Sequence, residues 1–406
     1  MATFAASWHT SEAAVSKSTL IAIDAGTLLT PTKKFVPGRV IIDGASIVEA
    51  GAASIKIPAG AERVDASQML VVPGFIEPHI HGCGGVDVMD GTYESLNAVS
   101  RILARHGTTS FLATTVSAPL ETLSLALEKL GGLMARSFDG AQPLGIHLEG
   151  PFINADKRGT HKAANVIPPY LSLLSNWIGL ANYSLRLVTI APELPGADAL
   201  ARFAKDAGVA VAMGHSNATF AEANAGVELG ICYAVHTFNA MRAFAHRDPG
   251  IVGAVLTDDR VFAEIIADGI HVDSSVVRLF ARAKGRERVL LVTDAISATD
   301  MPDGAYILGT DTVNVVNGIC RDAEGRLAGS TLTQEIALRN FAMWSAWPVD
   351  DALLGLTSNP ARALKLERKG VLEPGADADV VIMDTTFRIM KTFAKGKLVF
   401  DRLWIN

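Results

Sequence analysis

The sequence has few cysteines, no long run of charge and no basic cluster. Cys83, Cys232 and Cys320 are too scattered for a disulfide framework or a CxxC zinc site, which suits a reducing cytoplasm. The net charge is −6, so a nucleic-acid partner is disfavoured, because phosphate backbones need clustered Lys and Arg. Residues 1–16 lack the basic start and the unbroken apolar core of a targeting segment, and they are too short to cross a bilayer. We therefore expect a cytoplasmic protein without a nucleic-acid or membrane partner.

The chain is long and apolar enough to bury a large core. It has 406 residues, of which 49% are hydrophobic and 19% charged. This length fits one large domain plus a smaller one, or two to three ordinary domains. Residues 1–19 are expected to form an N-terminal tail, for which the sequence indicates no function.

The two ends of the chain read alike. Residues 20–72 and 371–406 contain short strands separated by turns, such as GRVIIDGASIVEAG and ADVVIMD. Similar β-rich ends that flank a different middle favour one small β-sandwich domain built from both termini.

The middle of the chain alternates between apolar runs and Ala- and Leu-rich helical stretches. The apolar runs that suit buried strands lie at 70–80, 109–116, 143–149, 185–191, 208–214, 231–237, 261–267 and 288–293. Eight strand–helix units are typical of a (β/α)8 TIM barrel, which we place at residues 73–370. An open doubly wound sheet is the main alternative. We expect a hairpin-like insert at 305–328 and helices at 334–365.

Polar side chains that suit chemistry follow the predicted strands at their carboxyl ends. They are His79, His81, Glu149, His215, His236, Asp268, His271 and Asp294. In a barrel these ends open onto one face, so we expect residues far apart in sequence to meet there.

The histidines and Glu149 predict a metal centre. His79 and His81 are spaced i, i+2 and therefore face one side of a strand end. Joined by Glu149, His215 and His236, they form a ligand set for divalent transition metals. Any one of these histidines alone would be read as a core or loop residue, but the whole set is not. His147 is left open between support of Glu149 and plain packing.

Asp294, in the motif VTDA, is the candidate general base. A carboxylate beside a cation stays ionised and can accept a proton from an activated water. The alternative is a helix cap. Arg247 and the GTHK segment at 159–162 lie in loops, where spacing alone does not separate function from a solvated turn.

The motifs together resemble a known family. PGFIEPHIHGCGG, HLEGPFI with KRGTHK, GHSNAT, HTFNAM, HRDPG, DGIHVD and VTDAI are similar, in order and spacing, to those of N-acetylglucosamine-6-phosphate deacetylases of the amidohydrolase superfamily. The resemblance covers nearly the whole chain after residue 20. It implies hydrolysis of N-acetylglucosamine 6-phosphate to glucosamine 6-phosphate and acetate.

The resemblance also assigns roles. It implies one or two divalent ions, zinc first, with iron, cobalt or manganese as alternatives. The ligands that it implies are Glu149, His215 and His236, with His79 and His81 for a second ion. Asp294 matches the catalytic acid/base, and His271 matches a residue that faces the acetamide. The positions that match substrate contacts are Thr160, His161, Asn239, Ala240, Asp268 and His271. Arg247 matches a residue that reaches the phosphate in the neighbouring subunit, which implies a homodimer.

Three alternatives stay open at this point. The galactosamine epimer has the same acetamide and phosphate, so the motifs do not separate it. A cyclic-amide hydrolase needs a carboxylated Lys at the fourth strand, where this sequence has APE at 191–193. A barrel that has lost its activity would have lost ligands, and this sequence keeps the whole set. Glu77 stands where the superfamily pattern more often has Asp.

Overall fold

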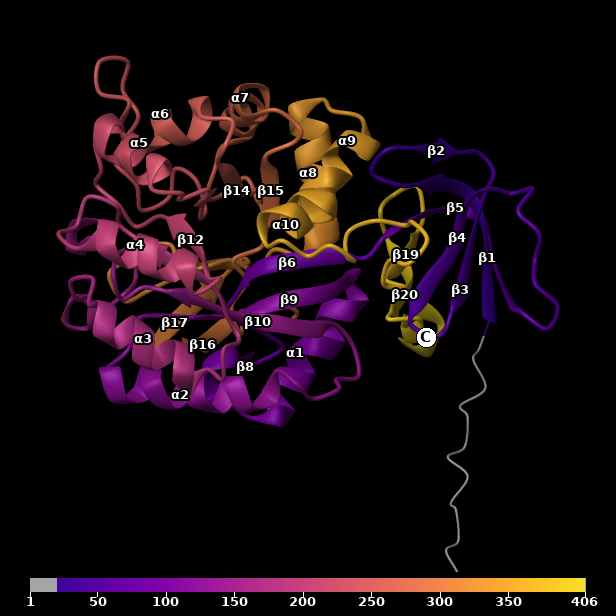
Figure 1. Cartoon of the computed structure of the whole chain (residues 1–406), viewed down its shortest axis with the longest axis horizontal. Helices are drawn as coiled ribbons and strands as arrows, with labels where there is room; N and C mark the ends of the chain where they lie inside the picture. Colours follow the sequence, from indigo (N-terminus) through magenta and orange to yellow (C-terminus); the bar gives the residue numbers. More distant parts are fainter. Residues whose placement is uncertain (1–19, 406) are drawn as a thin grey trace, which may run out of the picture.

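The computed structural model describes residues 20–405, so the predicted tail at 1–19 lies outside the described residues. The described chain forms a barrel flanked by a smaller β domain (Figure 1). Within residues 20–405, no helix is long and apolar enough to cross a membrane.

The barrel is an eight-stranded parallel sheet whose strands follow one another in chain order. Its strands are β6 (Phe75–Ile80), β9 (Thr108–Thr115), β10 (Gln142–Glu149), β11 (Leu185–Ile190), β12 (Ala210–Met213), β13 (Tyr233–Ala234), β14 (Phe262–Ile266) and β15 (Val289–Val292). A parallel bridge between Ile80 and Ala295 joins the two ends of the sheet. The TIM-barrel prediction is therefore confirmed, and the open-sheet alternative is wrong.

The strands form where the sequence has short runs rich in apolar and β-branched residues. Every residue of β6 and of β9 is buried. Strands of a parallel sheet are covered on both faces, so they need apolar side chains on both. Leu112, Leu187 and Tyr233 belong to one buried cluster that draws on successive strands of the barrel.

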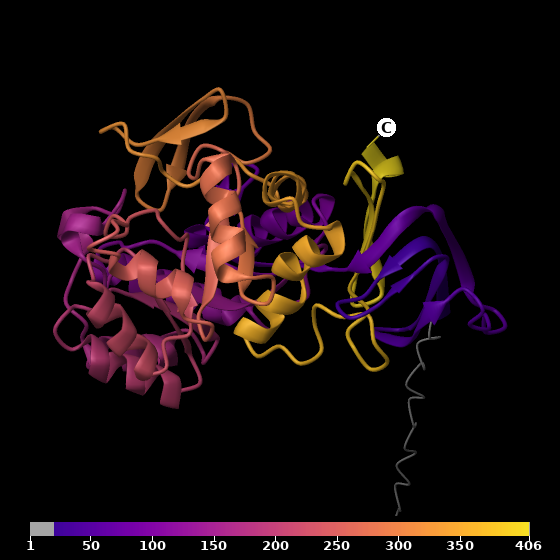
Figure 2. The same ribbon diagram turned by 90° about the horizontal axis from the view of Figure 1, so that it is seen from above.

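A helix follows each strand and covers the outside of the barrel (Figures 1 and 2). These helices are α1 (Tyr93–Arg105), α2 (Leu120–Leu133), α3 (Leu171–Leu180), α4 (Ala197–Asp206), α5 (Phe220–Glu228), α6 (Gly250–Thr257), α7 (Ser274–Lys284) and α8 (Gln334–Ser345). In α4, Ala197, Leu200, Ala201 and Ala204 are buried. This i, i+3, i+4, i+7 spacing places them on one stripe that faces the barrel.

An insert separates β15 from α8, as predicted, but it has three strands: β16 (Gly304–Leu308), β17 (Asp311–Val316) and β18 (Ile319–Arg321). Figure 2 shows it as the orange sheet beside the barrel. The backbone N–H of Gly309 donates to Asp87 Oδ2 at 2.8 Å, which ties the insert to the loop after β6. The helices α9 (Val349–Leu353) and α10 (Ser358–Ala363) complete the predicted 334–365 segment.

The small domain combines strands from both ends of the chain. Its sheet runs β21-β20-β19-β5-β1-β3-β4, and β2 pairs with β1. The strands are β1 (Leu20–Leu29), β2 (Lys34–Phe35), β3 (Gly38–Asp43), β4 (Ser46–Ala52), β5 (Glu62–Pro73), β19 (Val380–Met383), β20 (Ile389–Ala394) and β21 (Lys397–Asp401). A bridge from Ser46 to Asp377 brings the start of β4 back beside the chain that leads to β19, so the sheet folds over a shared core. The predicted two-termini domain is confirmed, while its boundaries at 72 and 371 stay predictions.

A histidine clamp holds three parts of the barrel together. His106, after α1, has Nδ1 2.8 Å from Glu335 Oε1 in the first turn of α8 and Nε2 3.1 Å from Asp300 Oδ2 in the loop after β15. Burial alone would lower the pKa of His106, but the two carboxylates raise it to about 9. The imidazole is therefore charged at neutral pH.

This clamp predicts a pH-dependent stability. Because the folded pKa is above the unfolded value, the stabilisation is complete below about pH 6.5 and is lost as the pH rises through about 9. We expect His106→Gln to lower the melting temperature at pH 6.5 and to make the melting temperature decline less between pH 6.5 and 9.5. The free energy of unfolding that the wild type loses over this range, and the variant does not, should be up to about 3 kcal/mol. Thermal melts over this range test it, with the exposed His246→Gln as the control. Equal slopes for the two variants would contradict the clamp.

Candidate active site

The predicted polar residues meet at the carboxyl ends of the barrel strands. His79 and His81 lie at the end of β6, and Glu149 is the last residue of β10. The other three members of the cluster follow their strands by two residues: His215 after β12, His236 after β13 and Asp294 after β15. All six side chains are buried.

The backbone is strained where three of these side chains enter the site. His215, His236 and Asp294 have φ values of 47°, 27° and 50°, in the left-handed region that non-glycine residues rarely adopt. Such conformations cost free energy and are concentrated at functional sites. Their recurrence after three strands of one barrel marks this end as the site.

Glu149 stands at the centre of the cluster. Its Oε1 lies 3.0 Å from His236 Nε2 and 3.3 Å from His215 Nε2, and the two imidazole nitrogens are 3.1 Å apart. Facing ligand atoms of these three residues all lie within 4.8 Å of one another. This spacing fits one divalent cation held by two imidazoles and one carboxylate.

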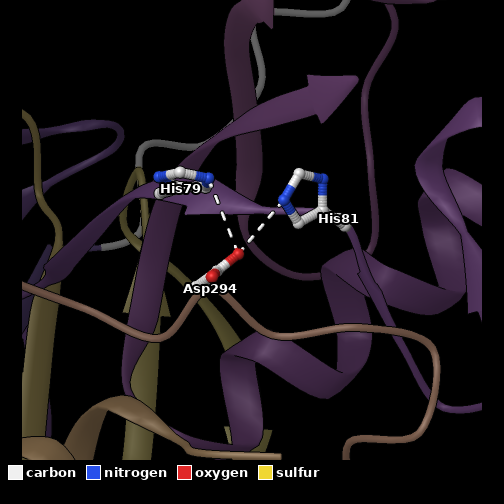
Figure 3. A group of neighbouring side chains, drawn as sticks. All are labelled: His79, His81 and Asp294. Carbon is white, nitrogen blue, oxygen red and sulfur yellow. Dashed lines mark ion pairs between the residues drawn. The ribbon is translucent and has the colours of Figure 1, made fainter. Parts of the chain in front are cut away.

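A second group shares the same carboxylate. Asp294 Oδ1 is 3.1 Å from His81 Nε2 and 3.6 Å from His79 Nε2, as the dashed lines in Figure 3 show. His79 Nε2 is also 3.3 Å from Glu149 Oε1, and His81 Nε2 is 3.4 Å from Glu149 Oε2. Glu149 therefore lies between the two groups, as a bridging ligand would.

The hydrogen bonds at Nδ1 of the cluster histidines show whether their Nε2 atoms are free to bind a cation. Each of three histidines has Nδ1 beside an oxygen acceptor, at 2.9 Å from Glu264 for His79, 3.0 Å from Thr114 O for His81 and 2.9 Å from Lys157 O for His215. An Nδ1–H that donates there leaves the Nε2 lone pair facing the carboxylates. His79 Nε2 is buried and has no hydrogen-bond partner among the described residues. Lone pairs and carboxylates repel each other, so a cation between them fits this donor set.

The electrostatics of the cluster favour positive charge at the same place. Burial alone would raise the pKa of Asp294, but His79 and His81 lower it to about 2. The reverse holds for His81, whose pKa rises to about 9 beside Asp294 and Glu149 although burial lowers it. Burial lowers the pKa of His215 to about 4, so this ring is neutral at pH 7. A divalent cation can supply the positive charge that protons would otherwise bring.

A cavity of about 300 Å³ opens above the cluster. The lining residues include His81, Glu149, Thr160, His161, His215, His236, Asn239, Ala240, His271, Asp294 and Arg326. A hollow of this size, lined mostly by polar side chains, suits a small polar molecule.

A family model supports the assignment of the site. Residues 70–399 match the model described as "Amidohydrolase family". The chain belongs to the amidohydrolase family.

Several known proteins similar to this amidohydrolase are N-acetylhexosamine-6-phosphate deacetylases. It is 39% identical over 342 residues to N-acetylglucosamine-6-phosphate deacetylase of Vibrio furnissii (84% of this chain, 86% of the relative). It is 38% identical over 343 residues to N-acetylgalactosamine-6-phosphate deacetylase of Escherichia coli O157:H7 (84% and 90%). Its fold matches, with a TM-score of 0.88 and 34% identity, a mutant N-acetyl-D-glucosamine-6-phosphate deacetylase of Mycobacterium smegmatis in complex with N-acetyl-D-glucosamine 6-phosphate (94% and 99%).

The structure brings most of the predicted substrate residues to the cavity. Thr160, His161, Asn239, Ala240 and His271 line it. Asp268 is not among the lining residues, and its Oδ2 instead lies 2.7 Å from His271 Nδ1. Arg247 is exposed in a tight turn closed by a bridge between Ala245 and Asp248. The roles of these residues in this amidohydrolase stay predictions.

Sequence reasoning missed several residues that shape the site. Glu264 is a fully buried carboxylate beside His79. The sequence indicates it only as a single acidic residue in the otherwise apolar run VFAEIIA. Ser117 holds His161 through a backbone N–H and a hydroxyl. Arg326 brings the insert to the cavity rim, with its guanidinium held by Asp322 at 2.6 Å. His147 bonds to Thr114 and Thr189 rather than to Glu149, so packing beside His79 describes it better than support of Glu149.

Proposed function

We propose that the chain hydrolyses N-acetylglucosamine 6-phosphate to glucosamine 6-phosphate and acetate. The observation that carries the proposal is a buried cluster of four histidines and two carboxylates, of which three histidines and both carboxylates line a cavity of about 300 Å³. Relatives that match most of the chain are named as deacetylases of N-acetylglucosamine 6-phosphate. The galactosamine epimer is the second candidate, because a relative at 38% identity is named for it.

Glu149, His215 and His236 would hold one divalent ion, and His79, His81 and Asp294 a second, with Glu149 shared between them. When bound, such ions polarise the acetyl carbonyl and lower the pKa of the attacking water. We propose zinc, with iron, cobalt or manganese as alternatives that imidazole and carboxylate ligands also accept.

Asp294 would move the proton. A carboxylate beside a cation stays ionised, so Asp294 can accept a proton from the water that attacks the acetyl carbon. The bond from the acetyl carbon to nitrogen then breaks. Asp294 returns the proton to the departing amine, and acetate and the free amino sugar leave.

His161 is better placed than His271 to stabilise the charge that develops on the carbonyl oxygen. The backbone N–H of Ser117 donates to His161 Nδ1 at 3.1 Å, so the proton of the neutral ring is on Nε2, which lies 3.7 Å from Glu149 Oε2 on the cavity floor. An N–H aimed at a developing oxyanion is a typical catalytic donor. His271 donates its Nδ1–H to Asp268, so its Nε2 is the nitrogen left to face a sugar hydroxyl.

Arg247 would bind the phosphate in the cavity of a second copy of the chain. Its turn carries the side chain into solvent, and Phe244, three residues earlier, is 54% exposed. An exposed Arg and an exposed aromatic on one loop suit an interface between subunits. We propose a homodimer with composite sites, and we propose that it works in the cytoplasm, where its three free cysteines stay reduced.

Acetate release tests the reaction. The protein, loaded in turn with zinc, iron, cobalt and manganese, is given the 6-phosphates of N-acetylglucosamine and N-acetylgalactosamine, and unphosphorylated N-acetylglucosamine. We expect the glucosamine phosphate to have the highest kcat/KM, and a chelator to abolish release reversibly. No acetate from any phosphorylated sugar with any ion would refute the proposal.

The composite site makes a separate prediction. Arg247→Ala should raise KM roughly 10- to 100-fold, since a hydrogen bond to a charged group contributes about 1.5–3 kcal/mol. Mixing it with an Asp294→Asn variant should restore low-KM turnover, because a mixed dimer has one site with both residues. Arg260→Ala, on the exposed surface, is the control. Proven subunit exchange without recovered turnover would contradict the shared site.

A further inference from the structure

Glu264 is an unusual residue for its position. It lies in the middle of β14, with no exposed surface, in a strand whose other members are apolar. A buried carboxylate is costly unless hydrogen bonds satisfy it. Its partners therefore indicate what it does.

Those partners belong to the metal cluster. Glu264 Oε2 lies 2.9 Å from His79 Nδ1 and accepts from the backbone N–H of His236 at 2.9 Å. The hydroxyl of Tyr233 donates to Oε1 at 2.7 Å. With both oxygens occupied the carboxylate cannot turn, so its acceptor face stays against the His79 ring.

This contact fixes which nitrogen of His79 is bare. A carboxylate accepts but does not donate, so His79 carries its proton on Nδ1. Nε2 then presents a lone pair towards Glu149 Oε1 at 3.3 Å and Asp294 Oδ1 at 3.6 Å. His81 has no such partner, because its Nδ1 faces the neutral carbonyl of Thr114.

We propose that Glu264 is a positioning residue that makes His79 a ligand and thereby determines whether the second ion, at His79, His81 and Asp294, is bound. The inference rests on the proposed function as a metal-dependent hydrolase. A carboxylate behind a metal-binding imidazole orients the ring and raises its basicity. The ion at Glu149, His215 and His236 depends on Glu264 only through one backbone N–H, so it should be retained.

Counting and titrating ions tests this without relying on turnover. The wild type should bind two zinc ions per chain. Glu264→Leu removes the acceptor and should weaken the second ion by about 100-fold, the upper end for loss of an outer partner. Glu264→Gln keeps an oxygen acceptor without the charge and should weaken it by about 10-fold. The first ion should bind as in the wild type in both variants.

A matched control separates positioning from stability. Gln334 is equally buried, accepts from Thr108 Oγ1 at 2.7 Å and donates to Ile76 O at 3.0 Å, and neither of these groups is a ligand. Gln334→Leu should lower the melting temperature and keep two ions. If Glu264→Leu does not fold, Glu264→Gln carries the test.

Other results would contradict either the positioning role of Glu264 or the proposed function. A second ion bound equally by wild type and both Glu264 variants would overturn the inference, as would a wild type that binds one ion or a simultaneous loss of both ions. In each case acetate release by the wild type would leave the proposed function standing. Two ions in the wild type, a selective loss in the variants and no acetate release would instead refute the function and leave the positioning role intact.

Discussion

Asp294→Asn should lower turnover by roughly 10²- to 10⁴-fold, the contribution of a general acid–base group. Asparagine keeps an oxygen near His81 Nε2, 3.1 Å from the native carboxylate, but it cannot take the water proton or return it to the amine. Glu149, His215 and His236 are untouched, so the first ion should stay bound, whereas the second ion, which Asp294 helps to hold, should bind more weakly. Single-turnover acetate release measures the turnover, and metal analysis counts the bound ions.

Two comparisons make this result specific. Asp303→Asn, the same exchange in the exposed insert, should leave turnover unchanged. KM should change little for Asp294→Asn, because the phosphate and the sugar keep their contacts. An Asp294→Asn enzyme with near-normal turnover would remove Asp294 from the proton-transfer role.

Glu149→Gln should abolish metal binding and turnover together. Among residues 20–405, Glu149 is the one carboxylate that faces all four cluster histidines, through Oε1 to His79, His215 and His236 and through Oε2 to His81. Loss of its charge should weaken both ions by more than about 100-fold, since loss of an outer partner alone costs 10- to 100-fold. Metal analysis after dialysis tests it.

Excess metal distinguishes lost affinity from lost chemistry. We expect high zinc concentrations to restore part of the Glu149→Gln turnover, whereas they should not rescue Asp294→Asn. Glu228→Gln, on an exposed side chain, is the control. Full metal content in dialysed Glu149→Gln would show that Glu149 is not a shared ligand.

The barrel could be predicted because the sequence patterns that define its strands are local. Apolar runs such as 109–116 define strands, and parallel strands align their carboxyl ends, so His79, Glu149 and Asp294 had to meet once the barrel closed. The two-termini domain followed from similar β-rich ends. The pairing of β5 with β19 did not, because no local pattern specifies which distant edge a strand meets.

The remainder of the site depends on contacts that no spacing encodes. Glu264 and His79 lie on strands that are not neighbours in the sheet, so only the closed barrel brings them together. The contrast between His161 and His271 depends on which nitrogen faces Ser117 or Asp268. The motifs placed both rings at the site, but only the partners of Nδ1 indicate which ring can donate.

The mixed origin of the small domain bears on how the protein emerges from the ribosome. β5 pairs with β1 on one side and β19 on the other, and β19 is synthesised about 300 residues later. Until then one edge of β5 is open to pairing with other chains. Nascent chains stalled before β19 should therefore expose an unpaired, aggregation-prone strand edge although all strands of the barrel have been synthesised. We expect the need for a chaperone to be greatest at this late stage of translation.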